Sequence, residues 1–294
     1  MFRIIRIRKV WYIASGALIL LSIASLLIFG LRTGIDYSGG TIITYETSNS
    51  NAAQIIESKI KDLSINSYQV KPSGNNQIMV KTIDLDSNQH STLTQNIQKE
   101  IPDIQEVKYD SIGPSVGKDL RNKSIIAITL AAFAIIVFVA FAFRKVPKPL
   151  KSWKFGFLAV IALLHDLLIT TGLVAILGHF FVWMEVDALF ITALLTVMGF
   201  SVHDTIVIYD RLRENFIKNP HKSIERVAEE SVNQTLARSI NTSLTTIIVL
   251  TALFLLGGLT IRHFILVLII GILIGTYSSI FVAAPLLVSW HKQK

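Results

Sequence analysis

Six long apolar runs decide what this chain can fold into. Each run has 19 to 28 residues, and at about 1.5 Å of rise per residue that is enough for a helix to cross a hydrocarbon core of roughly 30 Å. The runs are residues 11–31, 124–143, 155–178, 186–209, 240–258 and 263–290. Only 16% of the residues are charged, against about 25% in a typical soluble domain. The sequence therefore predicts a polytopic α-helical membrane protein with six transmembrane helices.

The basic residues are distributed unevenly between the segments that flank these runs. The segment before the first run carries 4 Lys and Arg, and segments 144–154, 210–239 and the C-terminal end carry 5, 6 and 2, whereas the two intervening short segments carry 0 and 1. Cytoplasmic loops are enriched in Lys and Arg. We therefore expect both termini in the cytoplasm. The net charge of +8 then reflects this topology and contact with lipid head groups, and it does not indicate a nucleic-acid partner.

The first apolar run predicts an uncleaved transmembrane helix. It follows a basic start, as in a signal peptide, but it is longer than the usual apolar core of about 7–15 residues. The chain has no cysteine, which excludes disulfides, thiolate metal sites and cysteine nucleophiles.

Residues 32–121 form the one sizeable region outside the predicted helices. Their patterning predicts a strand, a helix, two strands, a helix and a strand, which is the β-α-β-β-α-β order of the split βαβ, ferredoxin-like unit. The region contains no metal-ligand cluster, catalytic-triad spacing or phosphate-binding loop. We expect an exported binding or spacer domain and no enzymatic activity. The predicted division is 1–31 for the N-terminus and first helix, 32–121 for the α+β domain, and 122–294 for the other five helices with cytoplasmic loops 144–154 and 210–239.

Two glycine-containing motifs connect this domain to the membrane helices. In "GIDYSGGT", residues 34–41, Gly39 and Gly40 can take positive φ at no steric cost, and Asp36 can accept hydrogen bonds from nearby backbone N–H groups. In "SIGPSVGKDL", residues 111–120, Gly113 and Pro114 are typical of a linker. We expect both motifs to have a structural role.

Two acidic residues lie inside predicted transmembrane helices. Of the 20 Asp and Glu, eleven lie in segment 32–123, five in segment 210–239 and two in an outer loop. The remaining two are Asp166 and Asp204. Each follows a histidine: His165 and His203. Counting helical rise from the nearest basic residues, Asp166 lies about 18 Å from the membrane boundary and Asp204 about 10 Å. Such residues are costly in a bilayer and normally face a bundle interior or a wet cavity.

Four roles are compatible with this pattern. The aspartates could hold helices together as protonated or paired groups. The two His-Asp pairs contain metal-ligand types, but adjacent helical residues point about 100° apart, so one pair cannot easily aim both groups at one ion. An intramembrane aspartyl protease needs two facing carboxyl groups, and the Gly-x-Gly-Asp signature of that class is absent before Asp204. A proton relay is the fourth role, because buried carboxyl groups and histidines can exchange protons in the physiological pH range.

The fifth apolar run favours the relay. Arg238, Thr242, Thr245 and Thr246 recur at helical spacing and predict one polar stripe on an apolar helix. Arg238 and Asp204 lie in the same half of the membrane, so we expect them to pair. Each threonine could instead simply bond to its own helix backbone. In the last run, Gly271, Gly275, Ser278 and Ser279 predict close helix packing.

Several motifs together resemble the SecD/SecF family of bacterial protein-export subunits. The motifs are "IDYSGGT", "SIGPSVGKDL", "ALLHDLLIT", "FSVHDTIVIYDRLREN" and "GGLTIRHFILVLIIGILIGTYSSIFVAAPLL". They occur in the family's order over nearly the whole chain, and the fourth is the most specific. The roughly 90 residues between the first two helices favour the SecF branch over SecD, whose exported region is much larger.

This resemblance implies a function and a set of residues. SecF-like proteins sit in the cytoplasmic membrane, work with SecD and the SecYEG channel, and use the proton gradient without a cofactor to help complete preprotein export. The family's fourth-helix aspartate corresponds to Asp204 and its fifth-helix basic residue to Arg238; the third-helix pair corresponds to His165 and Asp166. His203 stands where many relatives have Asn. The alternatives are another proton-driven exporter of the resistance-nodulation-division type and, further removed, the aspartyl protease.

Overall fold

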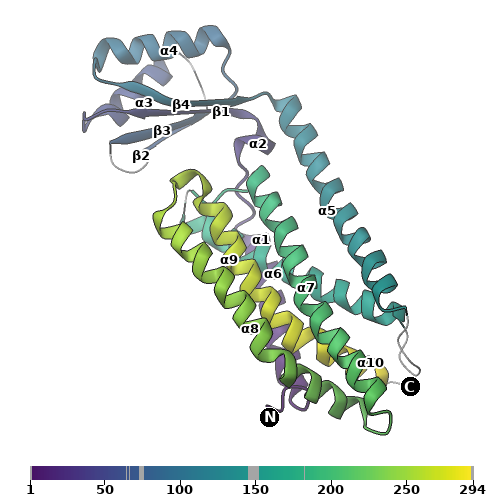
Figure 1. Cartoon of the computed structure of the whole chain (residues 1–294). Helices are drawn as coiled ribbons and strands as arrows, with labels where there is room; N and C mark the ends of the chain where they lie inside the picture. The colour runs from purple at the N-terminus through teal and green to yellow at the C-terminus, as the bar shows by residue number, and fades with distance from the viewer. Residues whose placement is uncertain are drawn as a thin grey trace. The chain divides into compact units, whose positions relative to one another are not determined.

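The computed structural model describes residues 2–63, 65, 67–72, 76–144, 152–181 and 183–292 (Figure 1). The chain divides into two compact units. One is Thr33–Ile125, and the other combines Met1–Arg32 with Ile126–Lys294. The first unit contains the sheet, and the second contains most of the long helices.

The smaller unit has the predicted order of elements. This order is β1 (Gly40–Glu46), α3 (Ala52–Asp62), β2 (Tyr68–Pro72), β3 (Gln77–Thr82), α4 (Ser87–Glu100) and β4 (Gln105–Ile112). The strand order is β2-β3-β1-β4, and every neighbouring pair is antiparallel. Strand β3 therefore separates β1 from β2, as in a split βαβ unit. The unit is assigned to the ferredoxin-like class from the order of its elements along the chain and the order of its strands in the sheet.

Periodicity explains why these segments fold onto one another. Helix α3 places Ile56 and Ile60 four residues apart on one face, and α4 does the same with Leu93 and Ile97. These four side chains pack with Ile43 of β1 in a fully buried cluster. Both helices lie along one face of the sheet (Figure 1), so the apolar core of this unit sits between the helices and the strands.

The two glycine motifs meet at one corner of the smaller unit. A short helix, α2 (Ile35–Ser38), is followed by Gly39 and Gly40, whose φ angles are +71° and +129°. The predicted positive φ is therefore confirmed. A Cβ on Gly40 would lie 2.5 Å from the carbonyl oxygen of Thr82, and one on Gly117 would lie 3.1 Å from the backbone nitrogen of Gly39. Glycine is required at this corner because backbones touch there.

The predicted linker at residues 111–120 is wrong. Strand β4 continues to Ile112, and helix α5 (Pro114–Ala142) begins only two residues later. Gly113 is the single residue between them. Proline suits the first position of a helix because its missing N–H has no intrahelical partner there and its φ is already helical. Pro114 therefore starts a helix where the sequence predicted a linker.

Six helices in the described residues are long and apolar enough to span a membrane, as predicted. They are α1 (Arg8–Ile28), α5, α6 (Ser152–Phe180), α7 (Ala188–Lys218), α8 (Ile224–Leu256) and α9 (Leu259–Ser278) with its continuation. This continuation consists of a π-helical turn, η1 (Ser279–Ala283), and α10 (Ala284–Lys292). Helix α7 packs against α6, α8 and α9, and α1 packs against α6.

The predicted cytoplasmic loop 210–239 is mostly helical. Helix α7 runs on to Lys218 and α8 begins at Ile224, so only residues 219–223 connect them. Ile224, Val227 and Ala228, at the start of α8, are buried in the core of the helical unit. Most of the other predicted loop, 144–154, lies outside the described residues.

Small residues let α7 and α9 approach closely, as the sequence predicted. A Cβ on Gly271 would clash with the side chain of Val197, and one on Gly275 would lie 3.0 Å from the Cβ of Ser201. Close backbone approach of this kind is the usual way that membrane helices gain packing energy. It brings polar groups on α7 and α9 within hydrogen-bonding distance.

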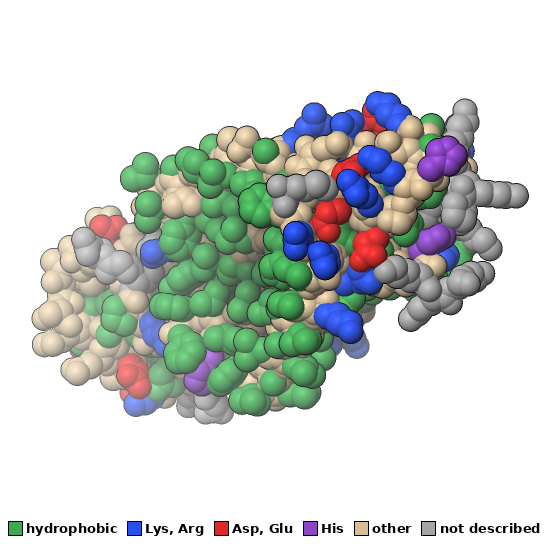
Figure 2. All heavy atoms as spheres, turned by 90° about the horizontal axis from the view of Figure 1, so that it is seen from below, with side chains coloured by type: hydrophobic (Ala, Val, Ile, Leu, Met, Phe, Trp, Pro, Cys, Tyr) green, Lys and Arg blue, Asp and Glu red, His purple; other side chains and the backbone are tan. Residues whose placement is uncertain are grey.

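The N-terminal segment is hydrogen-bonded to the first turns of α8. The Glu229 carboxylate accepts hydrogen bonds from the backbone N–H groups of Ile5 and Arg6, both at 3.1 Å. Asn233 makes two further bonds to the backbone of Phe2, and Ile5 is fully buried. Figure 2 shows charged side chains of both signs gathered at this end of the helical unit beside a broad hydrophobic surface. The segment thus fixes α8 relative to α1.

Candidate functional site

Asp166 is the centre of a hydrogen-bonded cluster inside the helical unit. It lies on α6 and is 0% exposed. Its Oδ2 accepts hydrogen bonds from the hydroxyls of Ser201 on α7, at 2.5 Å, and Ser278 on α9, at 2.7 Å. His165 Nδ1 lies 2.9 Å from Oδ1. Both carboxyl oxygens therefore have partners, and one side chain connects three helices.

The π-helical turn lies next to this cluster. The hydroxyl of Ser279 donates to the backbone carbonyl of Ser201 at 3.2 Å and lies 2.9 Å from the hydroxyl of Thr205. π-Helical turns occur frequently at functional sites. Here the consecutive residues Ser278 and Ser279 contact different helices. Ser278 bonds to Asp166 of α6 and Ser279 bonds to α7, so this end of α9 is held to both helices.

Asp204 has a different environment. It lies on α7 and is 2% exposed, yet its Oδ2 has no hydrogen-bond partner among the described residues. The hydroxyls of Ser243 on α8 and Thr276 on α9 lie within interaction range of this carboxyl group and 2.5 Å from each other. Buried polar groups in proteins are nearly always paired. An incompletely paired carboxyl group inside a membrane helix bundle marks Asp204 as the functional candidate.

The predicted ion pair between Asp204 and Arg238 is absent from the described contacts. Arg238 lies on the exposed side of α8, while Ser239, the next residue, is 1% exposed. Adjacent residues on a helix point about 100° apart, so only one of the two can face α7. His203 is exposed as well, although Asp204 beside it is buried.

The predicted polar stripe on α8 also points away from the rest of the chain. Thr242 and Thr245 are exposed and Thr246 is half-buried. Each hydroxyl donates to a backbone carbonyl of its own helix: Thr242 to Arg238, and Thr245 and Thr246 to Thr242. Within this chain these threonines therefore do not face the helix bundle.

A second polar stripe, which the sequence analysis missed, does face the bundle. Ser231, Thr235, Ser239 and Ser243 follow one another at intervals of four on α8, and all are buried. The strict spacing of four small hydroxyl residues was visible in "SVNQTLARSINTS". Arg238 lies on the adjacent face of α8. A long charged side chain is harder to bury than a serine, so the face with the serines is the one that packs into the bundle.

Neither of the other two chemistries is supported by a contact among the residues that the structure describes. Asp166 and Asp204 make no hydrogen bond to each other, whereas an aspartyl protease needs two carboxyl groups sharing a proton. The same residues contain no group of three or more His, Cys, Asp or Glu side chains positioned to hold a metal ion.

The fold defines a multi-pass membrane protein whose mainly apolar interior contains two buried carboxyl groups. Residues 92–293 match the family model described as protein export membrane protein SecD/SecF, C-terminal. The chain is 42% identical to the protein translocase subunit SecF of Thermobaculum terrenum, over 100% of this chain and 95% of the relative. It is 38% identical to that of Anaerolinea thermophila, over 99% and 94%.

Solved structures show the same fold. The crystal structure of SecDF, a translocon-associated membrane protein from Thermus, matches with a TM-score of 0.85 and 29% identity. A SecDF structure in a super-membrane-facing form matches with a TM-score of 0.71 and 28% identity. The chain covers 39% of each of those chains and is itself covered to 99%. The chain belongs to the SecF branch of the SecD/SecF family of protein translocase subunits, which confirms the resemblance seen in the motifs.

Proposed function

We propose that this chain is the SecF half of a proton-driven assembly that helps to complete preprotein export across the bacterial cytoplasmic membrane. The observation that carries the proposal is the Asp204 carboxyl group, which is buried in a membrane helix with an unpaired oxygen. A group in that position can take up and release a proton, and its charge changes the packing of α7, α8 and α9 around it.

The available energy is sufficient for such coupling. One proton that crosses a potential of 100 mV releases about 2.3 kcal/mol, before any contribution from a pH difference. Conformational states of one protein commonly differ by a few kcal/mol, so protonation of a single group can shift the population between them.

The exposed polar residues of the membrane helices support a partner. His203, Arg238 and Thr242 all lie on exposed positions of α7 and α8. Polar groups at membrane depth are costly when they face lipid and are normally covered by protein or water. SecD is the natural partner, because the matched SecDF chains are more than twice as long as this one. In this proposal Arg238 lies at the contact with SecD, and SecYEG and the emerging preprotein complete the assembly.

Gradient-dependent export in vesicles tests this function. We would reconstitute the chain with SecD and SecYEG, start export, and compare its completion with and without an ionophore that collapses the proton gradient. The proposal predicts that completion slows when the gradient is collapsed, and that the difference disappears when this chain is omitted. An exporter of small molecules would not require SecD and would give no difference in either comparison.

The proposed orientation has its own test. We place both termini in the cytoplasm and Thr33–Ile125 outside, so Gln98→Cys, on an exposed position of α4, should react with an impermeant thiol reagent added from outside. His221→Cys, in the connection between α7 and α8, should react only after the membrane is opened. The chain has no native cysteine, so each signal is unambiguous. The reverse pattern of labelling would refute the orientation.

A further inference from the structure

The buried stripe of α8 runs from the cytoplasmic end of the helix to the candidate site. We call Ser231, Thr235, Ser239 and Ser243 the hydroxyl face. Its ends are twelve residues apart, so it covers about 18 Å along the helix axis. Ser231 lies next to the charged residues at the start of α8, where Asn215 of α7 donates to its hydroxyl at 2.9 Å. Ser243 lies beside Asp204.

Two polar atoms along this path have no partner. The hydroxyls of Ser231, Thr235 and Ser243 each donate to a carbonyl of their own helix. Among the described residues, the Ser239 hydroxyl and the Asp204 Oδ2 atom are buried and make no hydrogen bond. Both side chains are at least 98% buried, since Ser239 is 1% and Asp204 2% exposed. Buried polar atoms of this kind are commonly satisfied by ordered water.

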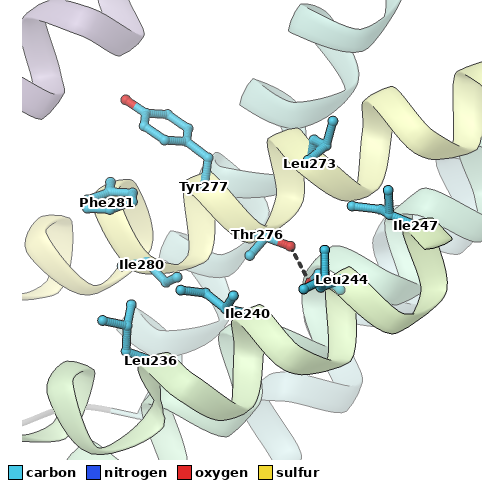
Figure 3. A pocket seen from close by; sticks show the side chains of 10 residues that line it. Leu236, Ile240, Leu244, Ile247, Leu273, Thr276, Tyr277, Ile280 and Phe281 are labelled. Atoms are coloured by element: carbon cyan, nitrogen blue, oxygen red, sulfur yellow. Dashed lines mark hydrogen bonds between the residues drawn. The ribbon is translucent and has the colours of Figure 1, made fainter.

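An apolar pocket between α8 and α9 lies beside the Ser243 end of the hydroxyl face. The pocket has a volume of about 250 Å³ and is lined mainly by apolar side chains of α8 and α9, among them Ile240, Leu244 and Leu273 (Figure 3). Its polar lining includes Ser243 and Thr276, whose hydroxyls bond to each other, as the dashed line in Figure 3 marks. A bound water needs polar partners, and the hydroxyl face offers more of them than this mainly apolar pocket does.

We propose that the hydroxyl face binds a file of water molecules that carries protons between Asp204 and the cytoplasm, with Ser239 holding the water nearest the carboxyl group. This inference rests on the proposed function. The proton leaves the Asp204 carboxyl group as part of a hydronium ion and passes along the waters, while the hydroxyls orient them and undergo no net change. The Ser243–Thr276 pair closes the path toward the apolar pocket.

The rate of proton entry into vesicles that contain the Ser239→Ala variant tests the role of the Ser239 hydroxyl. Complexes of the chain with SecD would be placed in vesicles with an internal pH dye, and an imposed pH gradient would drive proton entry. We expect entry about fivefold slower than in the unmodified complex, the effect of losing one hydrogen bond. Thr251→Ala removes an exposed hydroxyl from the same helix and should leave the rate unchanged. Equal rates in Ser239→Ala and the unmodified complex would overturn the inference.

Absence of proton flow from the unmodified complex would refute the proposed function. A second measurement tests the hydroxyl face without relying on proton flow. Methanethiosulfonates react with thiolates, which form in contact with water. We expect Ser239→Cys to react with 2-aminoethyl methanethiosulfonate, and Val232→Cys, fully buried on the same helix and without a native hydroxyl, to resist it. If Ser239→Cys is as unreactive as Val232→Cys in a complex that assembles normally, the inference fails.

Discussion

Asp204→Asn should abolish the gradient-dependent part of export while leaving the protein folded and bound to SecD. Asparagine has nearly the shape of a protonated aspartate but cannot release a proton. The native carboxyl group already lacks a partner at Oδ2, so the substitution breaks few contacts. We expect export in the presence of a gradient to fall to the rate measured with an ionophore.

An acidic residue elsewhere on the same helix provides the control. Asp210 is exposed on α7 and paired with Arg213 at 2.9 Å, and pairs of this kind contribute at most about 1 kcal/mol. Asp210→Asn should therefore keep full stimulation by the gradient. If Asp204→Asn also kept full stimulation, the proton relay would be wrong. If Asp204→Asn failed to assemble with SecD, the aspartate would be a structural residue.

Asp166→Ala should cause the largest loss of stability among the single substitutions considered for this chain. It removes an acceptor that is shared by Ser201, Ser278 and His165. Leaving buried donors without partners costs roughly 1–3 kcal/mol for each group, so we expect a loss of about 3 kcal/mol or more. The measurement is the fraction of folded, SecD-bound protein as a function of denaturant or temperature in mild detergent.

Two further variants separate a structural role for Asp166 from a relay. Replacing Ser201 and Ser278 by Ala in the Asp166→Ala background removes the two hydroxyls that have lost this acceptor and should restore part of the lost stability. Thr170→Val, on the same helix, removes a buried hydroxyl that has no partner among the described residues and should change stability little. If Asp166→Ala were as stable as the unmodified protein but inactive, Asp166 would belong to the proton path.

The class of fold could be predicted from the sequence because its signals are local. Apolar runs longer than a bilayer is thick predict helices that span it, whatever their neighbours are. Alternation and helical spacing within residues 40–112 similarly predict the order of strands and helices. The boundaries near Pro114 and Lys218 were wrong because charged and glycine-rich residues resemble loops in a sequence, although helices α5 and α7 include these residues.

The site was predicted only in part. Asp166 and Asp204 were found because carboxyl groups inside apolar runs are rare. Their different environments, with Asp166 paired through both oxygens and Asp204 left with one unpaired, depend on Ser201, Ser243 and Ser278. Serines are common in membrane helices, and nothing in a single sequence marks which of them reaches a given carboxyl group.

By itself, the sequence determined that this protein spans the membrane six times, that it carries one α+β domain, and that two carboxyl groups lie among its apolar helices. Only the tertiary structure decided that Ser239 of α8, and not Arg238, faces the bundle. The physical reason is rotational. Periodicity tells which residues share a face of a helix, but the packing of α8 against α7 and α9 selects which face is buried. Arg238 and Ser239 point about 100° apart on the helix, so a rotation of α8 by that angle would bury the arginine in place of the serine.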